Sequence, residues 1–125
     1  MKKKAIIPQG TDPSAMLFAP GIQVGDLLYT SGMVGVKDGK LVGEDIESQA
    51  RQALENLCVV LEAAGTTWEN IVKLNCFLAY PQRDFAGWNT VYKTFFPKNP
   101  PARTTIGGTA ALEGALIEID LVVVI

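Results

Sequence analysis

The stretch LIEIDLVVVI, residues 116–125, has the pattern of a β-strand and decides the architecture expected for the chain. Side chains alternate between the two faces of a strand. One face is apolar throughout and consists of Ile117, Ile119, Leu121, Val123 and Ile125. The other face begins with Glu118 and Asp120 and then becomes apolar at Val122 and Val124. A strand that becomes apolar on both faces needs cover on both sides of its sheet.

Two helices are predicted upstream of this strand. The first spans Glu44 to Ala64, because its apolar residues recur at three- and four-residue spacing and Gly65 provides a stop. This stripe consists of Ile46, Ala50, Ala53, Leu54, Leu57, Cys58, Leu61 and Ala64. The second helix spans about Arg83 to Phe96 and ends before Pro97. Its apolar face consists of Phe85, Trp88, Val91, Tyr92 and Phe95.

Short strands are predicted at Lys4–Pro8, Leu27–Thr30 and Ile71–Tyr80, and VKDGKLV, residues 36–42, is typical of a hairpin. Ser31-Gly32 interrupts the strand pattern after Thr30, which suggests a bulge or a close approach of the backbone. The resulting order favours an α+β sandwich with one sheet covered by two helices. Since one helical layer covers one face, we expect the other face to be buried against another subunit.

The composition sets the class of protein. The chain has 125 residues, which fits a single domain over residues 1–125, and 48% of them are hydrophobic. A net charge of −2 argues against a nucleic-acid partner. No apolar run has the length of a membrane span, and the lysine-rich start lacks the pattern of a signal peptide. These features lead us to expect a cytoplasmic protein.

The sequence contains no histidine. This absence excludes Ser-His-Asp and Cys-His catalysis and every histidine-ligated metal site. The two cysteines, Cys58 and Cys76, match no metal or redox spacing, and we expect both to be reduced core residues. We therefore predict no metal site, and any catalysis must use carboxylates, arginine, hydroxyls, backbone groups and water.

PPARTTIGG, residues 100–108, places Arg103 near the start of a predicted strand. If residues 103–108 and 116–122 form an antiparallel hairpin, Arg103 lies opposite Glu118 or Asp120. Two interpretations follow from this arrangement. The cluster is either a cross-strand ion pair or a site where the arginine captures a carboxylate and a nearby glutamate activates water.

The chain resembles the RidA family, also called YjgF-like proteins or reactive intermediate deaminases. The resemblance covers nearly the whole chain in the order of the family. Its segments are YTSG (29–32), QARQALENL (49–57), FAGWNTVYKTFF (85–96), PPARTT (100–105) and IEID (117–120). It implies a chorismate-mutase-like fold and a homotrimer with clefts between subunits. It also implies cofactor-independent hydrolysis of imines and enamines, such as 2-iminobutanoate and 2-aminoacrylate, to 2-oxo acids and ammonia.

The resemblance also assigns roles to residues. Arg103 matches the arginine that binds the substrate carboxylate, and Glu118 matches the acidic residue associated with the attacking water. Ser31 and Gly32 match the small-residue turn that lines the cleft, which accounts for the interrupted strand. Asn89 matches the asparagine of the family, although an exposed helical polar residue is an equal alternative.

Two substrate-binding positions depart from the best-known members of the family. Phe18 stands where those proteins have a tyrosine, and Thr105 stands where they have a cysteine. Loss of a hydroxyl that bonds to substrate costs about 0.5–1.5 kcal/mol. A regulatory trimer that binds 2-oxo or amino acids without turnover is therefore the main alternative. The ribonuclease activity attributed to some relatives is disfavoured by the acidic charge and the absence of histidine.

Overall fold

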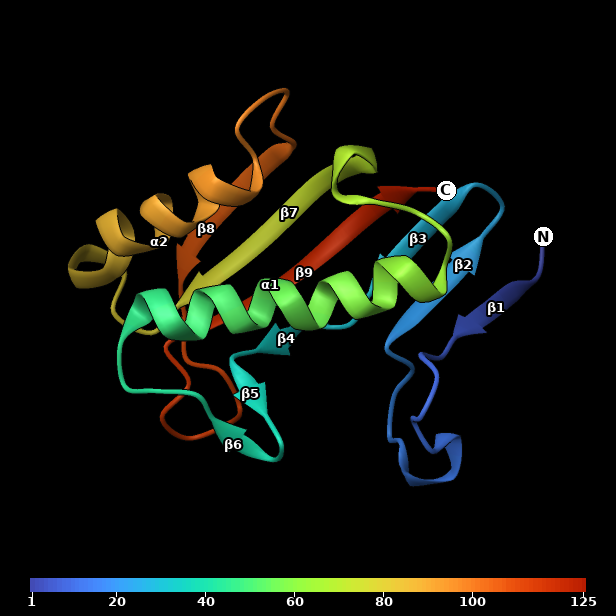
Figure 1. The fold of residues 1–125 in the computed structure, drawn as a ribbon, viewed down its shortest axis with the longest axis horizontal. Helices are drawn as coiled ribbons and strands as arrows, with labels where there is room; N and C mark the ends of the chain where they lie inside the picture. The colour runs from blue at the N-terminus through green and yellow to red at the C-terminus, as the bar shows by residue number, and fades with distance from the viewer.

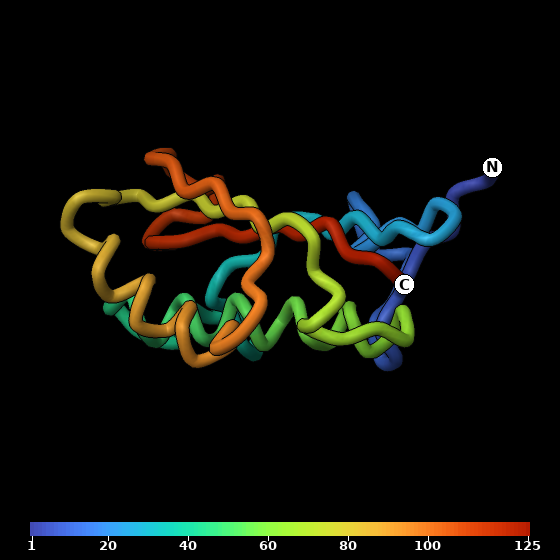
Figure 2. The backbone as a smooth tube through the Cα atoms, turned by 90° about the horizontal axis from the view of Figure 1, so that it is seen from above, coloured from blue at the N-terminus to red at the C-terminus, as the bar shows by residue number.

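The computed structural model describes all 125 residues and has two layers, a β-sheet and a pair of helices that both cover one face of it (Figures 1 and 2). The helices are α1 (Ile46–Ala63) and α2 (Pro81–Phe95), with single 3-10 turns at Pro13–Ala15 and Trp68–Asn70. The strands are β1 (Lys3–Ile6), β2 (Gly21–Val24), β3 (Leu27–Thr30), β4 (Met33–Val34), β5 (Val36–Lys37), β6 (Lys40–Leu41), β7 (Ile71–Leu78), β8 (Ala102–Gly107) and β9 (Ile117–Val124). The predicted α+β architecture is confirmed.

The sheet is mixed and has β9 near its middle. The strand order is β1-β2-β3-β9-β7-β8, and β4 also pairs with β9. The pair β7–β8 is parallel, while β9 is antiparallel to β3, β4 and β7. Strands β5 and β6 form the separate predicted hairpin, whose turn uses Asp38 and Gly39 at φ of 53° and 79°. Positive φ at both residues fits a tight two-residue hairpin turn.

The predicted hairpin between residues 103–108 and 116–122 is wrong. Strand β7 lies between β8 and β9, so Arg103 is opposite Leu74 rather than opposite a carboxylate. The partners of Glu118 and Asp120 are the β7 residues Phe77 and Asn75. The physical reason is the crossover through α2, because a strand–helix–strand unit returns its second strand parallel to the first. Residues 108–116 then carry the chain past the end of β7.

Strand β9 divides its side chains between the two faces as predicted. Ile117, Ile119, Leu121 and Val123 are at most 1% exposed beneath the helices. The opposite face carries no helix, and there Tyr29 and Val124 remain 47% and 39% exposed (Figure 2). This uncovered face of the sheet, which also bears Glu118 and Asp120, is called the open face below.

Local signals account for the ends of the helices. Asp45 caps α1 by accepting a hydrogen bond from the backbone N–H of Ser48, and Gly65 follows the helix at φ 77°. Helix α2 begins at Pro81, two residues before the predicted start, because proline fits the first helical turn. No helix of the structure has both the length and the apolar character needed to cross a membrane.

The two cysteines differ in their surroundings. Both are free thiols, and Cys76 lies in the core, where burial raises its pKa to about 12 although nearby Arg103 opposes the shift. Cys58 is only partly buried, and its Sγ lies 3.6 Å from Oε1 of Glu62 at the edge of the α1 stripe. The prediction that Cys58 is a core residue is therefore wrong. It lies at the edge of the stripe, and the three- and four-residue spacing did not resolve this partial exposure.

Gln49 connects α1 to two loops inside the protein. Its Nε2 donates to the carbonyls of Gly43 and Gly114 at 2.8 and 3.2 Å, and its Oε1 accepts from the backbone N–H of Leu116 at 2.7 Å. The residue is 1% exposed. Gly35 packs against its backbone, where an added Cβ would lie 2.6 Å from the carbonyl oxygen. Gln49 therefore fixes the segment that leads into β9.

We predict that Gln49→Ala lowers the free energy of unfolding by roughly 3 kcal/mol, because it leaves buried backbone groups without partners. Urea denaturation measures the change, with the exposed neighbour variant Arg51→Ala as the control. A loss for Gln49→Ala no larger than that of Arg51→Ala would contradict this role.

Candidate functional site

Arg103 lies on the edge strand β8 and extends toward α2. Its Nη1 donates a hydrogen bond of 2.8 Å to Oδ1 of Asn89. The guanidinium carbon lies 4.6 Å from the ring centroid of Tyr92 and 5.7 and 5.9 Å from those of Phe85 and Trp88. Phe85 and Tyr92 each lie three or four positions from the adjacent pair Trp88 and Asn89 on α2, so all four residues share one helix face. Together with Arg103 and Thr105 they are called the arginine cluster below.

The charge of Arg103 has no counterion in the chain. The one ion pair of the structure joins Arg83 to Asp84 at 3.0 Å, and no carboxylate lies within 4.0 Å of Arg103. The interpretation of Arg103 as half of a cross-strand ion pair is therefore wrong, since β7 separates it from Glu118 and Asp120. Aromatic rings stabilise a guanidinium without neutralising it. A half-buried, unpaired arginine with unused N–H donors is suited to bind an anion.

Tyr92 and Thr105 complete the arginine cluster. Burial raises the pKa of Tyr92, although the positive charge of Arg103 opposes the shift, and the phenol stays protonated at neutral pH. Thr105 follows Arg103 by two residues and faces α2 as Arg103 does, and its Oγ1 accepts a hydrogen bond of 3.4 Å from Nε1 of Trp88. The sequence predicted Trp88 and Tyr92 as core residues of α2, and their contact with the arginine was missed.

Glu118 lies on the opposite face of the sheet, beside Gly32. A Cβ added to Gly32 would come within 2.8 Å of Cδ of Glu118, so this carboxylate occupies the space that the missing side chain leaves. The structure thus explains the small residue in the break between β3 and β4. Asp120, two residues along on the same face, accepts a hydrogen bond of 2.8 Å from Nδ2 of Asn75. Glu118 makes no such side-chain bond and is the carboxylate left available for chemistry.

Ser31 and Phe18 extend this second group toward the N-terminal loop. The Ser31 hydroxyl donates to the carbonyl of Ala19 at 2.6 Å, and its backbone N–H donates to that of Pro20 at 2.9 Å. These bonds anchor the loop that carries Phe18. The Phe18 ring is 65% exposed and lines an apolar hollow together with Ile7, Pro13, Met16, Leu17 and Ala19.

The predicted site residues therefore form two groups. Arg103, Asn89 and Thr105 lie together between β8 and α2, whereas Glu118, Gly32 and Ser31 lie beyond β7, near the loop of Phe18. In Figure 1 the loop before β2 and the α2–β8 unit occupy opposite ends of the molecule. One chain thus separates Arg103 from Glu118.

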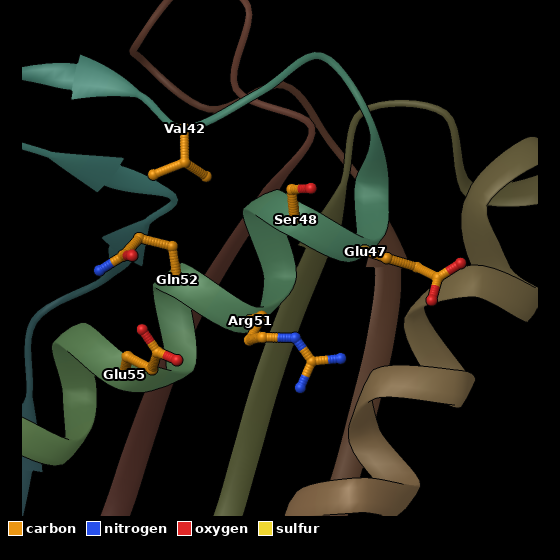
Figure 3. Close-up of a pocket in the computed structure, with 6 residues that line it drawn as sticks. All are labelled: Val42, Glu47, Ser48, Arg51, Gln52 and Glu55. Atoms are coloured by element: carbon orange, nitrogen blue, oxygen red, sulfur yellow. The ribbon is translucent and has the colours of Figure 1, made fainter.

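A further hollow, of about 320 Å³, lies on the exposed side of α1 (Figure 3). Its lining consists of Val42, Glu47, Ser48, Arg51, Gln52 and Glu55. It contains none of the predicted site residues, and Figure 3 shows that its lining comes from α1 and from Val42, which follows β6. No group of three or more His, Cys, Asp or Glu side chains is placed to hold a metal ion.

Comparison with known proteins shows the relatives of the chain. A protein from Dermatophagoides farinae named 2-iminobutanoate/2-iminopropanoate deaminase is 35% identical over 122 residues, which cover 96% of this chain and 91% of the relative. A Lactococcus lactis protein named putative regulator AldR is 34% identical over 107 residues, or 84% of each chain. Relatives at similar identity thus carry both an enzyme name and a regulator name.

Solved structures give the same relationship. YyfA from Yersinia pestis, described as a member of the conserved Rid protein family, superposes with a TM-score of 0.86 at 33% identity, covering 99% of this chain and all of that one. The family model described as Endoribonuclease L-PSP matches residues 10–125. The chain therefore belongs to the RidA (YjgF-like) family, to which this model corresponds.

Proposed function

We propose that the protein is a cofactor-independent deaminase that hydrolyses 2-imino acids and their enamine tautomers to 2-oxo acids and ammonia. Its substrates would include 2-iminobutanoate and 2-aminoacrylate. The observation that carries the proposal is Arg103, an arginine with no counterion, oriented by Asn89 and Tyr92. The deaminase names of relatives at 35–37% identity support it.

The proposal requires a second copy of the chain. Arg103 and Glu118 lie on opposite faces of the sheet, so one small substrate cannot contact both within one subunit. The open face is a surface that such a copy would cover, because Tyr29, Ile106 and Val124 are 39–48% exposed there. We propose a homotrimer in which each cleft combines the arginine cluster of one subunit with Glu118, Gly32, Ser31 and Phe18 of its neighbour.

The arginine cluster would bind and orient the substrate. Nη1 of Arg103 is directed by Asn89, which leaves the other guanidinium N–H groups to bind a carboxylate. Strand β8 is an edge strand, so it also has backbone groups that no neighbouring strand pairs. Phe18 would pack against the substrate from the other subunit. A carboxylate fixed in this way presents its adjacent C=N carbon in a constant position.

Glu118 would supply the water. A water molecule bound to Glu118 and to a backbone carbonyl near Thr105 gives a proton to Glu118 as it attacks the C=N carbon. The π electrons move to nitrogen, which takes up that proton from Glu118. The product is a carbinolamine. The hydroxyl proton is then transferred to the nitrogen as the C–N bond breaks, so that ammonia leaves and the 2-oxo acid forms. Since imines also hydrolyse slowly without a catalyst, the proposed acceleration would require only orientation and electrostatic stabilisation.

The second candidate is a regulatory trimer that binds 2-oxo or amino acids in the same clefts without turnover. Phe18 favours it, because this ring lacks the hydroxyl found in the best-known members of the family. The regulator name of the Lactococcus lactis relative also supports it. For either function we propose a single cytoplasmic domain, residues 1–125, without a nucleic-acid or membrane partner.

We predict that Arg103→Ala lowers imine hydrolysis by roughly hundredfold, because a charge-assisted bidentate contact is lost. The assay follows release of 2-oxobutanoate while threonine dehydratase generates 2-iminobutanoate and semicarbazide competes for it. Arg103→Lys should recover little of the imine hydrolysis, since an ammonium group lacks the planar pair of N–H donors that binds a carboxylate at both oxygens.

Arg51→Ala removes an equal charge on α1 and serves as the control. We expect Asn89→Ala to lose far less activity than Arg103→Ala. An active Arg103→Ala variant would contradict the assignment. If the parent protein binds 2-oxobutanoate but does not accelerate imine hydrolysis, the result would instead favour the regulatory trimer.

Glu118→Gln is expected to lower kcat by at least tenfold and to leave binding of 2-oxobutanoate nearly unchanged, because it removes the base and not the anion receptor. Gly32→Ala should have the same effect, since its Cβ would displace the Glu118 carboxylate. Asp120→Asn is the matched control, because this carboxylate on the same face is bonded to Asn75. Equal losses for Glu118→Gln and Asp120→Asn would argue against a specific role for Glu118.

A further inference from the structure

Trp88 makes a polar contact from within the core. The side chain is 0% exposed, and its Nε1 donates to Oγ1 of Thr105 at 3.4 Å. A buried indole N–H needs an acceptor, and this contact supplies it. The indole nitrogen can only donate, so the threonine oxygen must be the acceptor. In this hydrogen bond Trp88 is therefore the donor and Thr105 the acceptor.

The hydroxyl of Thr105 keeps its own hydrogen for another partner. Within the chain this hydroxyl donates to no other atom. Because one lone pair is directed at Trp88, the O–H vector is turned away from the indole. Thr105 lies two residues from Arg103 on the same face of β8, a separation of about 7 Å along the strand. The hydroxyl is therefore a free donor beside the guanidinium.

We infer that Trp88 is a positioning residue that orients the Thr105 hydroxyl as a second donor, next to Arg103, for the carboxylate of the bound acid. A carboxylate accepts several hydrogen bonds, and Asn89 already accepts one from Nη1 of the arginine. The oriented hydroxyl would replace, for the ligand carboxylate, the N–H donor of Arg103 that is bonded to Asn89. The inference rests on the proposed function for the identity of the ligand, a 2-imino or 2-oxo acid.

The test is calorimetric titration with 2-oxobutanoate. Thr105→Val removes the hydroxyl at nearly constant shape and should weaken binding roughly tenfold, since the lost bond goes to a charged group. Thr105→Ser keeps the hydroxyl and should bind nearly as the parent protein does. Trp88→Phe keeps a ring but removes the N–H. The Trp88→Phe variant should raise KM more than it lowers kcat. When it is combined with Thr105→Val, it should weaken binding of 2-oxobutanoate no further than Thr105→Val alone.

The two tryptophans provide a second measurement. On binding of 2-oxobutanoate, the indole N–H resonance of Trp88 should shift in the NMR spectrum, whereas that of Trp68, packed edge-on against Phe95 and Phe96, should not. Thr105→Val should abolish the shift. This experiment requires no tryptophan variant to fold, because both residues are native.

Unchanged binding by Thr105→Val, or equal shifts of both indole resonances, would overturn the inference. Additive losses from Trp88→Phe and Thr105→Val would also overturn it, because the tryptophan would then not act through the hydroxyl. Arg103→Ala separates this failure from that of the proposed site. If both Thr105→Val and Arg103→Ala bind 2-oxobutanoate normally, the proposed site itself is wrong. If Arg103→Ala loses binding and Thr105→Val does not, the site stands and only the role of Thr105 is wrong.

Discussion

The position of β7 between β8 and β9 is the constraint on which the functional arrangement depends. It separates Arg103 from Glu118 across the sheet, and the register of β7 with its two neighbours places Arg103 on the face covered by α2 and Glu118 on the open face. The α2 crossover imposes this order, because a strand that follows such a helix returns parallel beside the strand before it. Each half of the proposed site is thus formed by the fold of one chain, and their combination requires two chains.

The unpaired charge of Arg103 connects the fold to the proposed chemistry. A half-buried guanidinium loses hydration, and three aromatic rings and Asn89 replace only part of it. Because no carboxylate of the chain neutralises it, the proposed acid ligand would meet a guanidinium that Asn89 already orients. The same arrangement would serve an enzyme or a binding protein, so in the proposed mechanism turnover of the ligand depends on Glu118 and its water.

Local patterns predicted the elements well, whereas their arrangement depended on distant contacts. The stripe of α1 and the alternation of β9 identified both elements to within about two residues. Strand β2 was missed, because GIQV carries little strand signal apart from its partners β1 and β3. The pairing of Arg103 was predicted wrongly because the register calculation assumed that consecutive strands are neighbours. The aromatic partners of the arginine could not be assigned without the α2 crossover, although their spacing placed them on one helix face.

Subunit mixing tests the central claim, a site shared between two chains, most directly. Arg103→Ala and Glu118→Gln subunits are unfolded together, refolded at equal concentration, and assayed for imine hydrolysis after mass spectrometry confirms mixed trimers. In a shared site, about one quarter of the clefts pair an intact Arg103 with an intact Glu118, and activity should return in that proportion. Mixed trimers as inactive as either parent variant would show that both residues act within one chain, and would contradict the account.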